Sequence, residues 1–201
     1  INDLRYTSIP RINSNGFINK FNFLFKNVTT ESDNSNEYSN NFRSQNFGSI
    51  LYDISYPMKK EGKDFDNFLS GKASFMYSPN KNKNIKNLDR KINIKNIFNQ
   101  NRLGLSDSVE GGQSVTLGGE YKITDKQNNS ILTAGLASVL RDKNQKKLPI
   151  NSTINNKSSD IIGSFNFEPN SNFNLDYNFS VDNDLSSTNY NLIKADLTIN
   201  K

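Results

Sequence analysis

Cysteine and histidine are both absent from this chain of 201 residues, and so is tryptophan. Without cysteine there can be no disulfide bond, no thiolate nucleophile and no cysteine-bound metal. Without histidine the chain also lacks the side chain most often used as a metal ligand and as a general base near neutral pH. We therefore expect a protein that is not an enzyme and that holds no metal and no cofactor.

Long apolar runs are absent as well, and no stretch approaches the roughly 18 apolar residues of a transmembrane helix. Hydrophobic residues make up only 33% of the chain, which taken alone suggests a poor core. The 14 Phe and 8 Tyr are too many for a fully solvated chain, however, and they fall in alternating runs. Because the chain starts at Ile1 and stops within such a run, we interpret residues 1–201 as a single domain truncated at both ends.

The net charge of +5 is modest and spread along the chain. Basic residues gather only at residues 81–95 and 143–147, where solvated loops explain them better than a nucleic-acid site does. We therefore expect no nucleic-acid partner.

The clearest structural pattern follows a turn-rich approach that contains Gly104, Gly111 and Gly112. Apolar or small residues then alternate with polar ones, which is the period of a β-strand with two different faces. The apolar side comprises Val115, Leu117, Gly119, Tyr121 and Ile123. The polar side comprises Ser114, Thr116, Gly118, Glu120 and Lys122.

Similar alternation predicts strands along most of the chain, although residues 1–16 are ambiguous. The other expected strands are residues 17–28, 50–56, 69–77, 131–140, 161–168, 173–181 and 193–199. The most regular of them places Phe173, Leu175, Tyr177, Phe179 and Val181 opposite Asn174, Asp176, Asn178, Ser180 and Asp182. Residues 80–110 are expected to form a loop, in which a poor amphipathic helix and a short strand at residues 92–94 both remain open.

The connections sort by length. Long ones at residues 29–45, 80–110 and 141–158 alternate with short turns at residues 57–64, 125–129 and 169–172. Transmembrane β-barrels have this layout, with short periplasmic turns and longer external loops. The sequence therefore predicts an all-β fold, an antiparallel meander of about eight long strands that is part of a transmembrane outer-membrane β-barrel and is not closed on its own. A soluble β-sheet protein is the alternative.

The segment IFNQNRLGLSDSVEGGQSVTLGGEYKI, residues 97–123, resembles the LptD family of lipopolysaccharide-assembly proteins of the Gram-negative outer membrane. In that family an aromatic-containing Asn-Arg approach, a small or acidic turn and a Gln-x-(Val/Leu)-Thr-x-Gly strand recur. The matching positions are Phe98, Asn101, Arg102, Asp107, Glu110, Gln113, Val115, Thr116, Leu117 and Gly118. Residues 157–184 are similar to the barrel that follows this segment in alphaproteobacterial members. Together with the pair Gly111 and Gly112, the polar and glycine positions of this motif form the candidate junction between loop and strand.

The resemblance implies a barrel that receives lipopolysaccharide from a periplasmic bridge, through an N-terminal domain outside this sequence, and delivers it to the outer leaflet. It also implies an LptE-type plug lipoprotein inside the barrel and contact with outer-membrane lipid. The wet lumen or the plug surface would be lined by Lys72, Glu120, Lys122, Glu168 and Asp176. We expect residues 81–112 to be external, with residues 101–112 folded toward the barrel mouth. A passive porin-type diffusion channel and a surface adhesin are the alternative functions.

Overall fold

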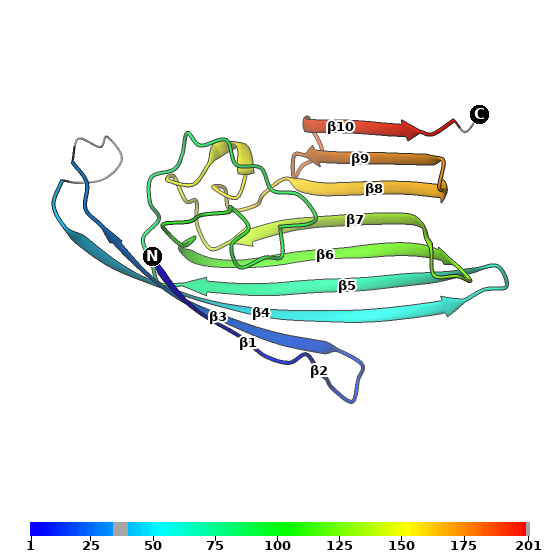
Figure 1. The fold of residues 1–201 in the computed structure, drawn as a ribbon, viewed down its shortest axis with the longest axis horizontal. Helices are drawn as coiled ribbons and strands as arrows, with labels where there is room; N and C mark the ends of the chain where they lie inside the picture. The colour runs from blue at the N-terminus through cyan, green and yellow to red at the C-terminus, as the bar shows by residue number, and fades with distance from the viewer. Residues whose placement is uncertain (34–39, 200–201) are drawn as a thin grey trace.

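The computed structural model describes residues 1–33 and 40–199 as one antiparallel β-sheet with loops folded onto one side (Figure 1). The polar loop expected at residues 29–45 lies partly outside these residues. The strands are β1 (Asn2–Thr7), β2 (Arg11–Ile12), β3 (Ile18–Thr30), β4 (Arg43–Glu61), β5 (Phe65–Ser78), β6 (Gly112–Asp125), β7 (Ser130–Arg141), β8 (Ile161–Asn170), β9 (Phe173–Val181) and β10 (Thr188–Leu197), with a short 3-10 helix η1 (Ile150–Ser152). No helix in the described part of the chain is long and apolar enough to cross a membrane.

From β3 to β10, each strand pairs with the next strand in the chain, and every pair is antiparallel. These eight long strands confirm the predicted meander. The short strands β1 and β2 both pair with the free side of β3. Among the described residues β1 and β10 do not pair with each other, so the sheet remains open, as expected for part of a barrel.

Two sequence-based boundaries need correction near the N-terminus. The ambiguous residues 1–16 contain β1 and β2. The turn expected at residues 57–64 is wrong in its first part, because β4 continues to Glu61 and pairs with β5 along this length. Lys59 forms an ion pair of 3.2 Å with Asp66 on β5. These opposite charges stabilise a contact between two strands. In the sequence alone, the same charged stretch resembles a turn.

The last strand also differs from its expected limits of residues 193–199, because β10 begins at Thr188 and ends at Leu197. Asn191 occupies a regular ladder position opposite Phe179, and its polar side chain hides the alternation. An apolar pattern alone could therefore not find the start of this strand.

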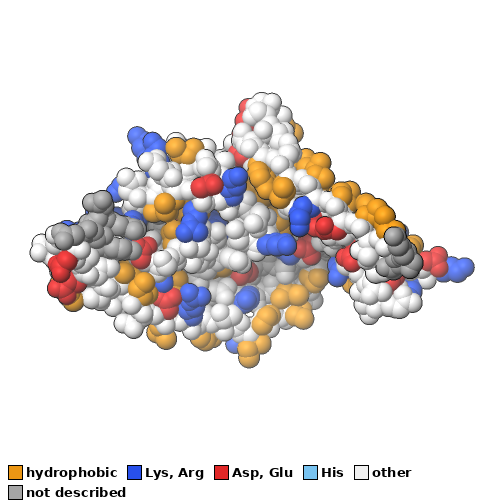
Figure 2. Space-filling view, turned by 45° about the horizontal axis from the view of Figure 1, so that its top comes forward, with side chains coloured by type: hydrophobic (Ala, Val, Ile, Leu, Met, Phe, Trp, Pro, Cys, Tyr) orange, Lys and Arg blue, Asp and Glu red, His pale blue; other side chains and the backbone are white. Residues whose placement is uncertain are grey.

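The strand register gives the sheet two different faces. One row across four neighbouring strands contains Tyr52, Phe75, Val115 and Leu140, and the next row contains Asp53, Ser74, Thr116 and Val139. The first row belongs to the outer face, where large hydrophobic side chains remain exposed; Leu136, for example, is 53% exposed. The second belongs to the inner face, defined as the side on which the loops pack. Figure 2 shows exposed hydrophobic side chains grouped together on the molecular surface.

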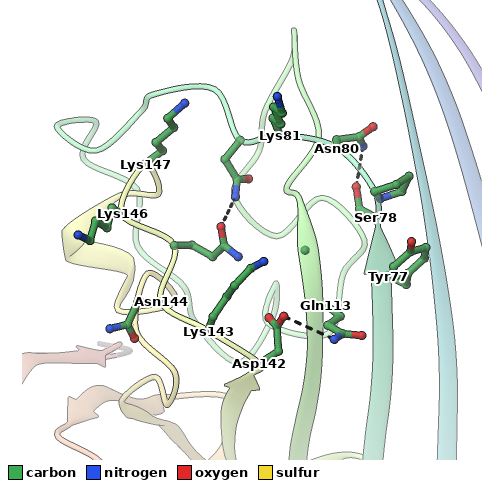
Figure 3. A pocket seen from close by; sticks show the side chains of 14 residues that line it. Tyr77, Ser78, Asn80, Lys81, Gln113, Asp142, Lys143, Asn144, Lys146 and Lys147 are labelled. Atoms are coloured by element: carbon green, nitrogen blue, oxygen red, sulfur yellow. Dashed lines mark hydrogen bonds between the residues drawn. The ribbon is translucent and has the colours of Figure 1, made fainter.

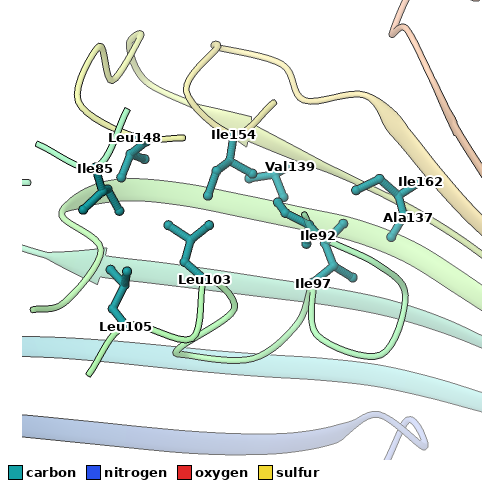
Figure 4. Close-up of a cluster of buried hydrophobic side chains, with 10 residues drawn as sticks. All are labelled: Ile85, Ile92, Ile97, Leu103, Leu105, Ala137, Val139, Leu148, Ile154 and Ile162. Carbon is teal, nitrogen blue, oxygen red and sulfur yellow. The ribbon is translucent and has the colours of Figure 1, made fainter. Parts of the chain in front are cut away.

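Two long loops pack on the inner face and supply most of the core. They are residues 79–111, between β5 and β6, and residues 142–160, between β7 and β8. Their apolar side chains meet those of β7 and β8 in one cluster (Figure 4). Its members are Ile85, Ile92, Ile97, Leu103, Leu105, Ala137, Val139, Leu148, Ile154 and Ile162. The apolar residues of the first loop therefore anchor it to the sheet.

Neither the helix nor the short strand considered for residues 80–110 is present in this loop. Asn93 instead forms a tight turn, in which its side-chain oxygen accepts hydrogen bonds from the backbone of Lys95 and Asn96 at 2.9 and 3.1 Å. Asparagine side chains favour such turns because they hydrogen-bond the backbone two or three residues ahead. The turn places Ile97 in the core, where it is fully buried.

Candidate functional site

A buried charge cluster joins the loop between β5 and β6 to the inner face of the sheet. It consists of Arg102 and Glu110 from the loop and Arg141 from the end of β7, which are 3%, 3% and 7% exposed. Arg102 Nε and Nη2 donate hydrogen bonds of 2.9 and 2.5 Å to the two carboxylate oxygens of Glu110. Arg141 Nη2 donates to Glu110 Oε1 as well. A single carboxylate therefore bridges two guanidinium groups from distant parts of the chain.

The first residues of β6 supply further hydrogen-bond partners for this cluster. Arg102 Nη2 donates to Ser114 Oγ at 2.9 Å, and Arg102 Nη1 donates to Thr116 Oγ1 at 3.1 Å. These two hydroxyls lie on one face because side chains two residues apart along a strand point the same way. Arg141 Nη1 donates to the carbonyl oxygen of Gly111 at 3.3 Å. Since a buried charge is costly unless it is paired and hydrogen-bonded, these contacts hold the loop against the strand.

Burial acts to raise the pKa of Glu110, because it disfavours the charged carboxylate. The positive charges of Arg102 and Arg141, and the hydrogen bonds that they donate, act in the opposite direction and prevail. The pKa of Glu110 is therefore lowered from its ordinary value of 4.5. Glu110 is ionised at neutral pH, and the cluster carries two positive charges and one negative charge.

The two glycines at the start of β6 occupy positions that a larger residue does not fit. Gly112 has a φ of +95°, a conformation that L-residues rarely adopt, and a Cβ there would lie 3.0 Å from Gln145 Nε2. A Cβ on Gly111 would overlap the carbonyl oxygen of Asn80. The backbone nitrogen of Gly111 donates to the side-chain oxygen of Asn82 at 2.7 Å. The loop can therefore approach the strand closely only with small residues here.

Asn101 and Asp107 shape the loop without joining the charge cluster. The side chain of Asn101 accepts a hydrogen bond of 2.8 Å from the backbone nitrogen of Leu105 and donates one of 2.9 Å to its carbonyl oxygen. Lys83 Nζ lies 2.6 Å from Asp107 Oδ2. The residues predicted for the junction thus divide into a buried cluster and a turn-forming group.

Gln113 and Gly118 lie on opposite faces of β6. Gln113 continues the outer row and donates a long hydrogen bond of 3.5 Å to Asp142. Gly118 lies on the inner face, where the ring of Phe98 comes so close that a Cβ would be 2.9 Å from its Cζ atom. The glycine of the motif therefore lets an aromatic side chain of the loop reach the strand backbone.

The five residues predicted for the lumen lie away from the charge cluster. Lys72 and Glu120 are on neighbouring strands of the inner face and form an ion pair of 3.3 Å, with side chains 35% and 38% exposed. Lys122 follows Glu120 by two residues on β6 and therefore lies on the same face. Asp176 accepts a hydrogen bond of 2.8 Å from an asparagine on β8. Glu168 is exposed and lies beside a register shift near the end of β8.

The sequence analysis missed Arg141 and the packing of residues 142–160. Arg141 follows a strand pattern that ends one residue earlier, so its position on the inner row was not recognised. Leu148 and Ile154 are nearly completely buried, although they lie in a polar stretch. Isolated apolar residues within a long polar loop were the available signal that this loop folds back onto the sheet.

The charge cluster is suited to holding the loop against the sheet. Both ends of the Glu110 carboxylate are occupied by guanidinium groups, and all three charged side chains are enclosed. In the described residues 1–33 and 40–199, no group of three or more acidic residues, histidines or cysteines is placed to hold a metal ion. The cluster therefore adds a second attachment to a loop that its apolar residues also anchor to the sheet.

A family model described as "LptD: LPS transport system D" matches residues 26–197 of the chain. A search of curated proteins gave no match. The family comprises proteins of the Gram-negative outer membrane that take part in lipopolysaccharide transport, and they are transport and assembly proteins. The matched residues include the charge cluster, the glycine pair and all strands from β4 to β10. Because the match covers most of the sequence and agrees with the resemblance of residues 97–123, the chain belongs to the LptD family.

Proposed function

We propose that residues 1–201 form one partial barrel domain in the wall of a translocon that inserts lipopolysaccharide into the outer leaflet of the outer membrane. The lipopolysaccharide would arrive from a periplasmic bridge through a domain outside this sequence. An LptE-type plug lipoprotein would occupy the remaining lumen. No covalent step is required, because the work of such a protein is to provide a polar path next to an apolar wall.

The observation that carries this proposal is the contrast between the two faces of the sheet. The outer face exposes apolar and aromatic side chains along β3 to β7 and on β10, as a wall against lipid does. The inner face combines ion pairs such as Lys72 with Glu120 and two loops held by buried polar contacts. A polar, partly filled interior is typical of outer-membrane barrels that are plugged.

The loop at residues 79–111 is the part of the chain best placed to act on transport. It lies at the end of the sheet where the long connections gather, which we assign to the cell exterior (Figure 1). Its docking by Arg102 and Glu110 would narrow the mouth of the barrel from inside. Lys72, Glu120, Lys122, Glu168 and Asp176 would face the wet part of the lumen or the plug.

The test uses the full-length protein carrying Gly111→Val and Gly112→Val. Either valine would force the start of β6 away from the loop, because Gly111 has no room for a side chain and Gly112 has a φ of +95° that L-residues rarely adopt. Gly71→Val is the matched control, since a Cβ at this strand position meets nothing within 4 Å. Surface lipopolysaccharide, outer-membrane permeability to large antibiotics and the amount of folded barrel are measured together in cells.

Loss of surface lipopolysaccharide with a normal amount of folded barrel in the double variant, and no change in Gly71→Val, would support a role of the docked loop in delivery. Loss of the folded barrel itself would show that the two glycines are needed for folding and not specifically for transport. Unchanged delivery and permeability would contradict the proposed role of the loop. If instead only the uptake of small solutes changed, the chain would be a passive diffusion channel of the porin type.

A further inference from the structure

A basic pocket of about 610 Å³ lies where β5 ends and β6 begins (Figure 3). The loop that follows β7 forms its other side, and the two loops meet there through a hydrogen bond of 2.9 Å between the side chains of Asn82 and Gln145. Four lysines line it, which are Lys81, Lys143, Lys146 and Lys147. Asp142 is the one acidic residue among the lining residues. The pocket therefore has a net positive charge.

The four lysines of this pocket have no ion-pair partner in the part of the chain that the structure describes. The buried Arg102 and Arg141, by contrast, both bind Glu110. Like charges that converge without a partner repel each other, so the gathering of lysines favours an external anion.

The pocket includes two residues of the outer face of the sheet. Its lining includes Tyr77 and Gln113, which are opposite each other in the register of β5 and β6. Phe75 and Val115 are also opposite each other, two residues from Tyr77 and Gln113 along β5 and β6. All four residues therefore lie on the outer face. Tyr77 is 45% exposed and Phe75 is 44% exposed. A tyrosine between an apolar wall and a polar pocket is typical of the membrane–water interface.

A shallow apolar groove of about 550 Å³ runs over the middle of the same strands on the outer face. Small residues, Gly119 and Ala134, form its floor, and larger ones such as Leu117, Tyr121 and Leu136 border it. The alternation of small and large side chains makes a channel in an otherwise apolar wall.

The distance between pocket and groove suits a lipid. Gln113 and Gly119 are six residues apart on β6, and a strand rises about 3.4 Å per residue, so they are separated by roughly 20 Å. Barrel strands tilt by about 40°, so this separation is about 15 Å along the membrane normal, which equals the hydrocarbon thickness of one leaflet. A lipid whose charged headgroup occupied the pocket would therefore extend an acyl chain along the groove.

We propose that the outer wall of β5 to β7 holds one lipopolysaccharide molecule from outside the barrel, with a phosphate in the lysine pocket and an acyl chain in the groove. This inference rests on the proposed function in one respect, namely that the long loops face the cell exterior. Among outer-leaflet lipids, a phosphorylated and acylated saccharide supplies both the anion and the chains that the two sites require. The site differs from the inner face, since Tyr77, Gln113 and the groove residues Gly119 and Ala134 lie on the outer side of the sheet.

The experiment measures lipopolysaccharide binding to the full-length protein purified in detergent, by titration and by native mass spectrometry of the retained lipid. Lys81→Gln combined with Lys143→Gln removes two charges from two sides of the pocket. A lysine near an anionic lipid headgroup contributes about 1 kcal/mol, so we expect binding at this site to weaken about 30-fold. Lys60→Gln combined with Lys63→Gln, at the opposite end of the sheet, is the matched control and should bind as the unchanged protein does.

Ala134→Leu fills the groove on the lipid-facing side without touching the lysines. It should weaken binding of the acylated lipid and leave binding of inorganic phosphate unchanged, and this arm holds even if the lysine variant assembles poorly. Heat-modifiable migration on gels reports whether each variant is folded. Equal lipopolysaccharide binding by all variants would overturn the proposal. Binding of phosphatidylglycerol as strong as that of lipopolysaccharide, or binding of phosphate with no effect of Ala134→Leu, would overturn the assignment of the lipid.

A separate measurement distinguishes failure of this site from failure of the proposed function. A Lys143→Cys variant is labelled on intact cells with a membrane-impermeant maleimide. If this position is labelled only after the outer membrane has been permeabilised, the orientation assumed for the barrel is wrong and both proposals fail. If it is accessible and lipopolysaccharide binding does not depend on the lysines, only the outer-wall site is wrong.

Discussion

The substitution Glu110→Gln tests directly whether the buried charge cluster holds the loop of residues 79–111 in place. Glutamine has almost the same shape as glutamate but removes the negative charge that binds Arg102 and Arg141. Two guanidinium groups would then remain enclosed with no counter-charge. Removing one partner of a buried ion pair typically costs about 3–5 kcal/mol. We expect this cost to appear as loss of loop docking, since the strands are held by their own ladder.

The expected effect is large enough to measure as local opening. A cost of about 3–5 kcal/mol raises the population of the undocked loop by roughly two to four powers of ten. Limited proteolysis of outer-membrane vesicles would therefore cleave Glu110→Gln within residues 79–111 far faster than the unchanged protein. Heat-modifiable migration would show the barrel itself still folded.

Asp107→Asn is the matched control, because it makes the same carboxylate-to-amide change three residues earlier in the loop. The ion pair of Asp107 with Lys83 is more open, with side chains 16% and 32% exposed, and exposed pairs contribute at most about 1 kcal/mol. Its cleavage should rise by no more than about tenfold. If Glu110→Gln were cleaved no faster than Asp107→Asn, the charge cluster would not be what docks the loop.

Two further predictions concern the wall and the acidity of the cluster. Tyr177 lies on the same outer face as Phe173, and Tyr177→Arg should cost about 2–4 kcal/mol of folding free energy in lipid vesicles, measured by denaturant titration. If the variant were as stable as the unchanged protein, Tyr177 would lie outside the membrane. Because the pKa of Glu110 is lowered on folding, its stabilising contribution is complete above the ordinary pKa of 4.5 and is lost as the pH falls through the lower folded value. Protection of residues 79–111 from an acid-tolerant protease should therefore fall as the pH is lowered below about 4.5, and Glu110→Gln should remove this pH dependence.

The strands could be predicted because each of them has one face against a polar interior and one apolar face. That constraint acts on every second residue, so the period of two is visible in segments such as residues 113–123 and 173–181. It fails where polar residues occupy the ladder, as Asn191 does in β10, and where charges pair across strands, as Lys59 does with Asp66. In those places the hydrophobic pattern does not distinguish a strand from a turn.

The loop core and the charge cluster could be predicted only in part. The family motif identified Arg102 and Glu110, but it could not show that they bind each other or that Arg141 completes the cluster. Their contacts join residues from one loop and two strands, and no local spacing encodes such a meeting. Likewise, single residues such as Ile97 and Ile154 form a core only after both loops have folded onto the sheet.

The assignment of the two faces is the basis of the whole account, and neighbouring cysteines in β9 test it most directly. The chain contains no cysteine, so single Tyr177→Cys and Asn178→Cys variants can be compared without background from these residues. In outer membranes, a water-soluble maleimide should label Asn178→Cys, which lies on the inner face, and should leave Tyr177→Cys protected by lipid. Ready labelling of Tyr177→Cys with protection of Asn178→Cys would reverse the faces and contradict the barrel described here.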